Sequence, residues 1–459
     1  MSPQFSVQAV LFPALFTKPL HACFDQQHGT SDGGAILLKA ADQRLGLTAG
    51  LAAVLADPRQ PAKTRHSIRA LLQQRIYGLA CGYTDANDAA RLADDPLHKL
   101  LLDRDPLLGD PLASQPTLSR FENQVSPRSS HRLGRVLLDG VIARHRRRLG
   151  AGLRTITLDL DVTDDETHGA QQLSFFHGHY RHACYLPLLA FLSFADEAEA
   201  YLCAAVLRPG NASTARGALS LLRRVLPRLR RAFPRARILV RLDGGFAGPA
   251  LLAFLDRQPR LTYVLGLAEN AILRRQSDLL MAAARWSADR TGQTEHLYSD
   301  FAYKAKTWSQ PRRVIVKAEV VQLEGREPRD NPRFLVTNLR QSPQWVYERI
   351  YCRRGEIENR IKELKDGLAI DRTSCSRFWA NQFRVLLTAA AFLLMQEIRL
   401  AATGTGCARA QVTTLRERLL KLGAWVAVSV RRTVLHLPCA FPWRADWVQI
   451  ARSLGAAPG

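Results

Sequence analysis

The sequence lacks the features that define several large classes of protein. Its eight cysteines include no Cys-x-x-Cys pair, which argues against a zinc ribbon or a disulfide framework and fits a reducing compartment. The longest nearly apolar run, Val385–Met395, is too short to cross a bilayer. Residues 1–16 are apolar but contain no basic segment or clean cleavage site, so we predict no signal peptide. We therefore expect a soluble, cytoplasmic protein that does not act in a membrane.

Acidic residues are also scarce relative to basic ones. Lys and Arg number 64 and Asp and Glu 41, which gives a net charge of +23 and a pI near 10.3. A field of this sign attracts polyanions, and the planar guanidinium of arginine matches the geometry of phosphate. Charge alone does not separate DNA from RNA or from an anionic membrane surface, but it favours nucleic acid as the partner.

The length and hydropathy pattern predict several regions. A chain of 459 residues exceeds what one compact core usually holds, and 47% hydrophobic residues is typical of a folded protein. Residues 1–150 show mainly helical periodicity, and the chain has no internal repeat or low-complexity tract. At the other end, residues 403–459 begin with a Thr-Gly-Thr-Gly linker at residues 403–406 and are predicted to form a C-terminal region.

From Thr155 onward the hydrophobic period changes to that of β-strands. The predicted strands are Thr155–Val162, Tyr185–Phe194, Tyr201–Leu207, Arg237–Leu242 and Tyr263–Leu267, with a helix at about Ala212–Phe233. Three strands followed by a helix that crosses to a fourth is the element order of a ribonuclease-H-like mixed sheet. We assign residues 151–267 and 346–402 to this α/β core, and residues 268–345 to a β-rich insertion between its two parts.

One stretch, Tyr351–Lys365, has an unusual distribution of polar residues. Stepped as a helix, it places Tyr351, Arg354, Glu358 and Lys365 within an arc of about 60°. An apolar stripe that would anchor the helix adjoins this arc: Ile357, Ile361, Leu364 and Leu368. An ordinary amphipathic helix with surface salt bridges is the alternative. A site for an anionic substrate and a metal-binding carboxylate would require the observed arrangement.

Two aspartates at strand ends supply further carboxylates. Asp161 closes the first strand, and Asp243 closes the fourth, where Gly244 and Gly245 break the pattern. Together with Glu358 they form the set of hard oxygen ligands that a two-metal site needs. Asp159 lies on the same strand face as Asp161, and either could be the first carboxylate of this set. An Asp at a strand end is common, so this pair carries little weight by itself.

The spacing Tyr-x2-Arg-x3-Glu-x6-Lys resembles the Y-R-E-K motif of bacterial DDE insertion-sequence transposases, a cut-and-paste class with a ribonuclease-H-like catalytic domain. Asp161-Val162-Thr163 is similar to the Asp-x-Thr of some members. Other segments look like one subgroup of this family: Ala80–Asp88, Ser114–Asn123, Leu207–Asn211, Asp243–Phe246 and Tyr263–Asn270. The departure is Asp243-Gly-Gly, where the family pattern has Asp-Ser-Gly. The resemblance covers nearly the whole chain.

The resemblance implies a complete set of roles. Asp161, Asp243 and Glu358 would be catalytic and would hold two Mg²⁺ ions, for which Mn²⁺ can substitute, with Asp159 as a further metal-adjacent group. Residues 1–150 would bind DNA. The residues expected to contact DNA are Tyr351, Arg354, Lys365, Asn359, Lys362, Arg146, Arg147 and Arg120. The partners would be the double-stranded element ends and target DNA, bound by a homodimer at the bacterial nucleoid.

Several alternatives stay open at this point. A nuclease with the same core would hydrolyse DNA without joining strands, and a domesticated or inactive relative would only bind it. The basic end of the helix that finishes at Arg148 could complement the helix dipole or contact phosphate. The motif His177-Gly-His179-Tyr-Arg-His182 fits a basic hairpin better than a zinc site. Trp308 is more readily explained as a core residue than as a base-stacking one.

Overall fold

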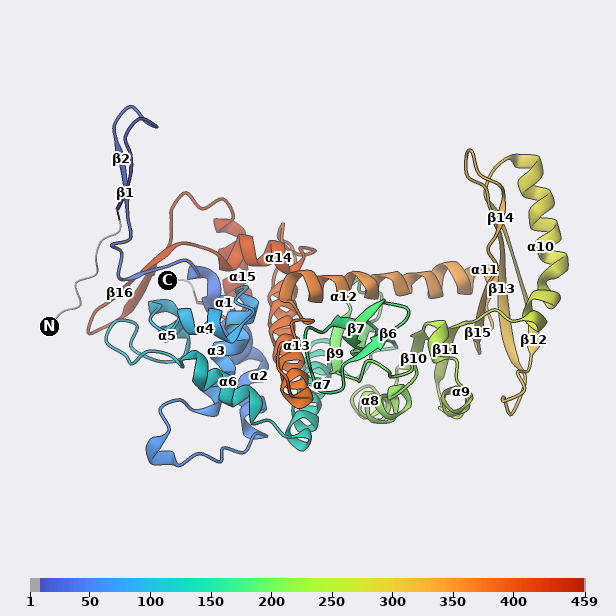
Figure 1. The fold of residues 1–459 in the computed structure, drawn as a ribbon, viewed down its shortest axis with the longest axis horizontal. Coiled ribbons are helices and arrows are strands. Elements are labelled where there is room, and N and C mark those ends of the chain that lie inside the picture. Colours follow the sequence, from blue (N-terminus) through green and yellow to red (C-terminus); the bar gives the residue numbers. More distant parts are fainter. Residues whose placement is uncertain (1–8, 458–459) are drawn as a thin grey trace.

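A nine-stranded mixed sheet forms the centre of the molecule in the computed structural model, which describes residues 9–457 (Figure 1). Its strand order is β12-β13-β15-β11-β10-β4-β8-β9, with β14 paired to β13. Five of these strands come from the predicted core: β4 (Thr155–Val162), β8 (Leu188–Phe194), β9 (Tyr201–Val206), β10 (Arg237–Leu242) and β11 (Leu261–Leu267). The predicted strand positions are therefore confirmed to within a few residues, and the class is mixed α/β.

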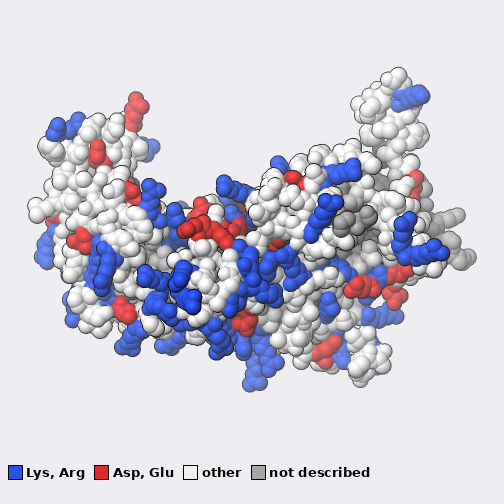
Figure 2. All heavy atoms as spheres, turned by 180° about the vertical axis from the view of Figure 1, so that it is seen from behind, with Lys and Arg blue, Asp and Glu red and all other residues white. Residues whose placement is uncertain are grey.

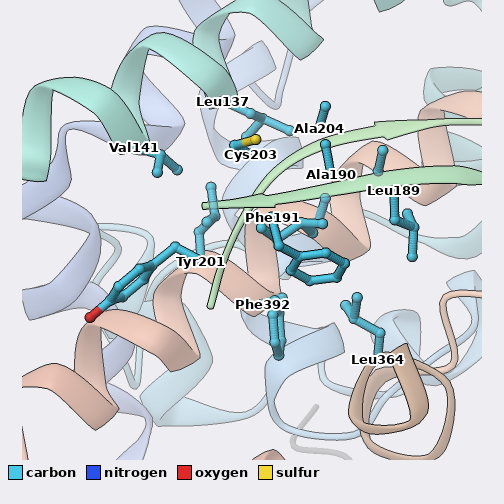
Figure 3. Packing of buried hydrophobic residues seen from close by; sticks show 14 of the residues in the cluster. Leu137, Val141, Leu189, Ala190, Phe191, Tyr201, Cys203, Ala204, Leu364 and Phe392 are labelled. Carbon is cyan, nitrogen blue, oxygen red and sulfur yellow. The ribbon is translucent and has the colours of Figure 1, made fainter. Parts of the chain in front are cut away.

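The pairing of β4 sets the geometry of the sheet. It runs parallel to β10 and antiparallel to β8, and both faces of this central part are covered by helices. Leu137 and Val141 of α7 (Pro127–Leu149) pack on one side, and Phe392 of α13 (Phe378–Ala401) and Leu364 pack on the other (Figure 3). Because parallel strands place their carboxyl ends at one edge, residues that follow β4 and β10 meet there.

Further helices cover the two faces of the sheet. On the side of α7 lie α8 (Ala218–Ala232) and α9 (Pro249–Asp256), and on the opposite side lies α12 (Gly355–Leu368) (Figure 1). Helix α13 is buried along almost its entire length, because its apolar residues extend around the helix instead of forming one stripe. It lies between the N-terminal helices and the sheet. No helix among residues 9–457 is long and apolar enough to cross a membrane.

The segment between the two parts of the core extends the same sheet. Strands β12 (Glu295–Tyr303), β13 (Arg312–Val321) and β15 (Arg333–Thr337) join it through pairing of β15 with β11, and β14 (Arg329–Asp330) extends β13. A helix that the sequence reading missed, α10 (Ala271–Thr291), packs on β12 and β13. Its buried residues are spaced as in a helix: Leu273, Ser277, Met281, Ala284 and Ala288. This stripe has a weak hydropathy signal, because a serine and two alanines occupy three of its five positions.

The N-terminal region is helical, as predicted. Its helices are α1 (Ile36–Leu45), α2 (Leu47–Ala53), α3 (Ile68–Ala80), α4 (Ala86–Arg91), α5 (Pro96–Leu101) and α6 (Gln115–Asn123). A hairpin of β1 (Ala9–Phe12) and β2 (Leu20–Cys23) projects from it (Figure 1). The buried Arg384 of α13 joins this region to the core, since it contacts Asp85 at 3.0 Å and Glu122 at 3.6 Å.

The C-terminal region contacts the N-terminal one. Strand β16 (Ala424–Val428) pairs with both β17 (Thr433–His436) and β3 (Gly29–Thr30). The single strand predicted at Val426–Leu437 is therefore wrong, because the chain turns back at residues 429–432. The predicted helix Arg409–Leu422 is shorter, comprising α14 (Val412–Leu415) and a π-helical turn to Leu420, and α15 (Arg444–Ser453) follows.

The stretch predicted as one helix, Tyr351–Lys365, consists of three helical forms. A π-helical segment, Val346–Tyr351, follows the short α11 (Pro343–Trp345), and a 3-10 turn at Cys352–Arg354 leads into α12. The apolar stripe is confirmed, because all four of its residues are buried: Ile357, Ile361, Leu364 and Leu368. Uniform steps of 100° do not apply before Gly355, so the positions of Tyr351 and Arg354 depend on the tertiary structure.

Candidate active site

The three predicted carboxylates lie near one another at one end of the sheet. Asp161 is close to the end of β4, and Asp243 directly follows β10; the register places Arg241 opposite Asp159, two residues earlier on each strand. Glu358 lies in the first turn of α12. The guanidinium of Arg354 links two of them, with Nη2 at 2.8 Å from Asp161 Oδ1 and Nη1 at 3.5 Å from Glu358 Oε1.

Electrostatic interactions connect the whole group. Burial raises the pKa of Asp161 to about 6, and the charges of Asp243 and Glu358 act in the same direction, while Arg354 opposes them. Burial lowers the pKa of Arg354, but the surrounding groups, first Asp161 and then Asp243, Tyr351 and Glu358, together more than offset this effect, so that its pKa is raised. The Arg354 Nε is buried and has no hydrogen-bond partner in the described part of the chain. Arg354 therefore supplies the positive charge that balances this acidic site.

The turn after β10 is shaped by glycines. The Gly245 N–H donates to Asp243 Oδ1 at 2.6 Å. A β-carbon on Gly266 of β11 would lie 2.7 Å from the Gly244 nitrogen and 2.9 Å from the Tyr351 hydroxyl, so that position has room for hydrogen only. A β-carbon on Gly244 would meet nothing closer than 3.6 Å. The Asp-Gly-Gly departure is therefore sterically minor, because the β-carbon of a serine fits at position 244.

Asp159 has a different environment from Asp161. It is fully buried, and Arg241 of β10 donates to both of its carboxylate oxygens, at 2.7 and 2.8 Å. Arg241 also donates to the Ile350 carbonyl at 3.1 Å, which ties both strands to the π-helical segment that carries Tyr351. Since both oxygens are occupied, this geometry favours Asp161 as the first carboxylate. The metal-adjacent role of Asp159 stays a prediction.

Lys365 and Tyr351 flank the site. Lys365 Nζ lies 2.7 Å from Asp164 Oδ1 in the loop after β4, and His182 Nε2 lies 3.2 Å from Asp164 Oδ2. His182 belongs to a small three-stranded sheet of β5 (Asp165–Glu166), β6 (Phe175–His177) and β7 (His182–Tyr185), in which it faces His177. The predicted hairpin is therefore present. Tyr351 is half-buried, and its ring lies 5.9 Å from that of Tyr347.

The remaining predicted DNA contacts are spread over the surface. Asn359 and Lys362 are exposed on α12, near the carboxylates. Arg146 and Arg147 lie in the last turn of α7, where the adjacent Arg148 is instead engaged with Glu197 at 2.6 Å. Arg120 lies on α6, in the N-terminal region. Lys and Arg side chains are spread across the face of the molecule that Figure 2 shows, with smaller groups of Asp and Glu among them.

The structure identifies supporting residues that sequence reasoning missed. Arg208 is buried and donates to the carbonyls of Leu186, Ser213, Thr214 and Arg216, which fixes the loop after β9. A β-carbon on Gly245 would lie 2.7 Å from Thr214 of this loop. Arg208, Gly245 and Gly266 all fall within the segments that carry the family resemblance. Their position in these segments is the sequence feature that could have identified them, but only the fold shows what each residue contacts.

We predict that Asp165, which lies beside the site, makes the stability of the protein depend on pH. It is fully buried, accepts a hydrogen bond from Thr373 at 2.8 Å, and burial raises its pKa to about 8. A carboxyl whose pKa rises on folding stabilises the protein below its unfolded pKa, and this stability is lost as pH rises toward the folded value. We expect Asp165→Asn to gain stability over wild type by on the order of 1 kcal/mol per pH unit as pH rises from 5 to 8. Urea unfolding at several pH values measures this difference, and a constant difference would contradict it.

A second polar cluster lies away from these carboxylates. Asp32, Cys81 and His98 bring potential ligand atoms within 4.8 Å of one another. Asp32 is already paired, however, with His98 Nε2 at 2.9 Å and Lys421 Nζ at 2.7 Å. Burial also raises the pKa of Cys81, which keeps its thiol neutral. The cluster is therefore satisfied internally, and it joins the N-terminal and C-terminal regions.

Comparison with protein families identifies the class. Residues 12–458 match the family model described as transposase DDE domain group 1. The match extends over almost the entire chain. The protein therefore belongs to the DDE transposase family.

Two other comparisons add context. No curated protein matches the sequence. Among solved structures, the chain is similar to a piggyBac transposase in a synaptic complex with hairpin DNA, with a TM-score of 0.43 and 11% identity. This alignment covers 85% of this chain and 79% of that one.

Proposed function

We propose that this protein is an insertion-sequence transposase that binds terminal inverted repeats, cuts the element ends by hydrolysis and joins their 3′-hydroxyls to target DNA. The observation that carries the proposal is the gathering of Asp161, Asp243 and Glu358 around Arg354 in a chain of the DDE family. The strand order β9-β8-β4-β10-β11, with β10 and β11 parallel to β4, supports a ribonuclease-H-like core. The bacterial Y-R-E-K subclass is part of this proposal.

The three carboxylates are a suitable set of ligands for divalent metal ions. Mg²⁺ prefers oxygen ligands and keeps several waters, so three carboxylates beside a substrate phosphate can hold it. Two such ions would activate the attacking oxygen and stabilise the leaving one. In this structure the oxygens of the three carboxylates do not all approach within 4.8 Å, as judged over residues 9–457, and the Arg354 guanidinium links Asp161 and Glu358. The Arg354 guanidinium would therefore have to leave Asp161 Oδ1 for that oxygen to hold a metal ion.

The proposed reaction has two steps, and residues beside the carboxylates would bind the DNA during both. In the first step a water oxygen bonds to phosphorus and the 3′-oxygen leaves as a hydroxyl; in the second, this hydroxyl attacks a target phosphate and displaces the target's own 3′-oxygen. We assign phosphate binding to Arg354, Lys365 and Tyr351, with Asn359 and Lys362 beside them. Two ends must be joined together, so the proposed working unit is a homodimer on DNA.

The decisive experiment is incubation of a labelled duplex carrying the element end with the protein and Mg²⁺. Nicking at the end followed by joining to a target duplex supports the transposase. Cutting without joining indicates a nuclease with the same core. Binding without cutting in either Mg²⁺ or Mn²⁺ indicates an inactive or domesticated relative.

Removing Arg354 is expected to strengthen metal binding in the absence of DNA. Its guanidinium lies 2.8 Å from Asp161 and repels an incoming cation. We expect Arg354→Gln to bind Mn²⁺ about tenfold more tightly than wild type, which corresponds to about 1.4 kcal/mol. Electron paramagnetic resonance of free Mn²⁺ measures this affinity without requiring catalysis. Arg353→Gln is the matched control, because Arg353 is adjacent and exposed. Equal affinities in the two variants would contradict the role of Arg354.

A further inference from the structure

A basic pocket lies in the N-terminal helical region, apart from the carboxylates. It encloses about 450 Å³ between the loop that precedes α3 and the start of α6. Five cationic side chains line it, with Asp110 as the one carboxylate in the lining: Arg59, Lys63, Arg65, Arg104 and Arg120. In Figure 1, α3 and α6 lie on the opposite side of α13 from β10 and β11. The pocket is therefore separate from the proposed catalytic site.

Two of the arginines are held in position by protein groups. Arg104 donates to the Asp110 carbonyl at 2.9 Å and to His66 Nδ1 at 2.7 Å. Arg59 pairs with Asp57 at 2.7 Å and donates to the His66 carbonyl at 2.9 Å. Both guanidiniums are thus ordered before any ligand arrives, which reduces the entropy lost on binding.

Most of the positive charge of the pocket is not balanced by ion pairs. Within the described residues no carboxylate forms an ion pair with Lys63, Arg65, Arg104 or Arg120. Burial and the nearby Arg104 lower the pKa of His66, so that its ring stays neutral and accepts a hydrogen bond from Arg104. Several like charges around one cavity repel one another, and an anion bound among them would remove this cost.

We propose that this pocket binds a backbone phosphate of DNA and forms a second anchor, distinct from the contacts around Arg354. Guanidinium forks suit the phosphate group, and the hydroxyls of Ser114 and Thr117 in the lining can donate to its oxygens. A phosphate contact of this kind positions the duplex and does not read its sequence. The inference rests on the proposed function only in that DNA is the substrate.

The salt dependence of DNA binding tests the proposal. Arg65 and Arg120 are exposed and lack ion pairs, so Arg65→Gln/Arg120→Gln should fold normally. Arg257→Gln/Arg326→Gln, also exposed but outside the pocket, removes the same charge. We expect the pocket variant to reduce the slope of log affinity against log salt by about 1 to 2, equally for element-end and unrelated duplexes. A pocket variant whose slope matches that of the control variant would overturn the proposal.

A second probe separates DNA from free phosphate compounds. Inorganic phosphate should raise the thermal midpoint of wild type and leave that of the pocket variant unchanged. Stabilisation by phosphate without a change in the DNA salt slope would overturn the DNA assignment and indicate a site for a free phosphate ester. Cleavage by the wild-type protein is a separate readout. If the wild type does not cut DNA but the salt slopes of the pocket and control variants differ, the proposed transposase activity is rejected and the pocket assignment is retained.

Discussion

Glu358→Gln is expected to bind element-end DNA as wild type does and to leave it uncut. The amide keeps the size of the side chain but removes the charge that a divalent metal requires. A metal clamp is worth several kcal/mol in the transition state, so we expect the cleavage rate to fall at least about a thousandfold. Gel shift and strand cleavage, measured on the same preparation with Mg²⁺, give both quantities.

Glu356→Gln is the control for this experiment. Glu356 lies two residues away on α12, is exposed, and points away from the arc of Glu358. Both variants lose one negative charge from the same helix, so a general electrostatic effect would appear in both. If Glu358→Gln cuts DNA at the wild-type rate, Glu358 is not the third carboxylate. If the two variants fail equally, the defect lies in α12 as a whole.

Gly266→Ala is expected to reduce cleavage by about a hundredfold, the cost that a misplacement of about 1 Å can have at an active site. The added methyl would lie 2.7 Å from the Gly244 backbone nitrogen and 2.9 Å from the Tyr351 hydroxyl. The backbone that follows Asp243 cannot move aside without moving the carboxylate. Overpacking of this kind also costs about 1 to 3 kcal/mol of stability.

Gly244→Ala is the matched control, because its β-carbon would meet nothing closer than 3.6 Å. We expect Gly244→Ala to retain nearly full activity and stability. Circular dichroism and thermal unfolding check that Gly266→Ala is folded at the assay temperature. A folded Gly266→Ala that cuts as fast as Gly244→Ala would show that the Asp243 turn tolerates displacement. The assignment of Gly266 as a positioning residue would then be wrong.

Much of the core could be predicted from periodicity. The strands at Thr155–Val162 and Arg237–Leu242 were predicted with their observed ends, because alternation and the Gly-Gly break are local signals. Helix α10 was missed because alanines and a serine fill much of its buried face. The turn inside the predicted strand at Val426–Leu437 was missed because neither glycine nor proline marks it.

The sequence by itself determined the identity and order of the chemical groups: the excess of arginine, the carboxylates at strand ends, and the Tyr-Arg-Glu-Lys spacing. These follow from local residue patterns and from the resemblance they carry. Only the tertiary structure decided which groups share an environment. It paired Asp159 with Arg241, placed Arg354 between Asp161 and Glu358, and set Gly266 against the Asp243 turn. Apart from Arg354 and Glu358, which are four residues apart, these contacts join residues tens to hundreds of positions apart, and their distances depend on how strands and helices pack.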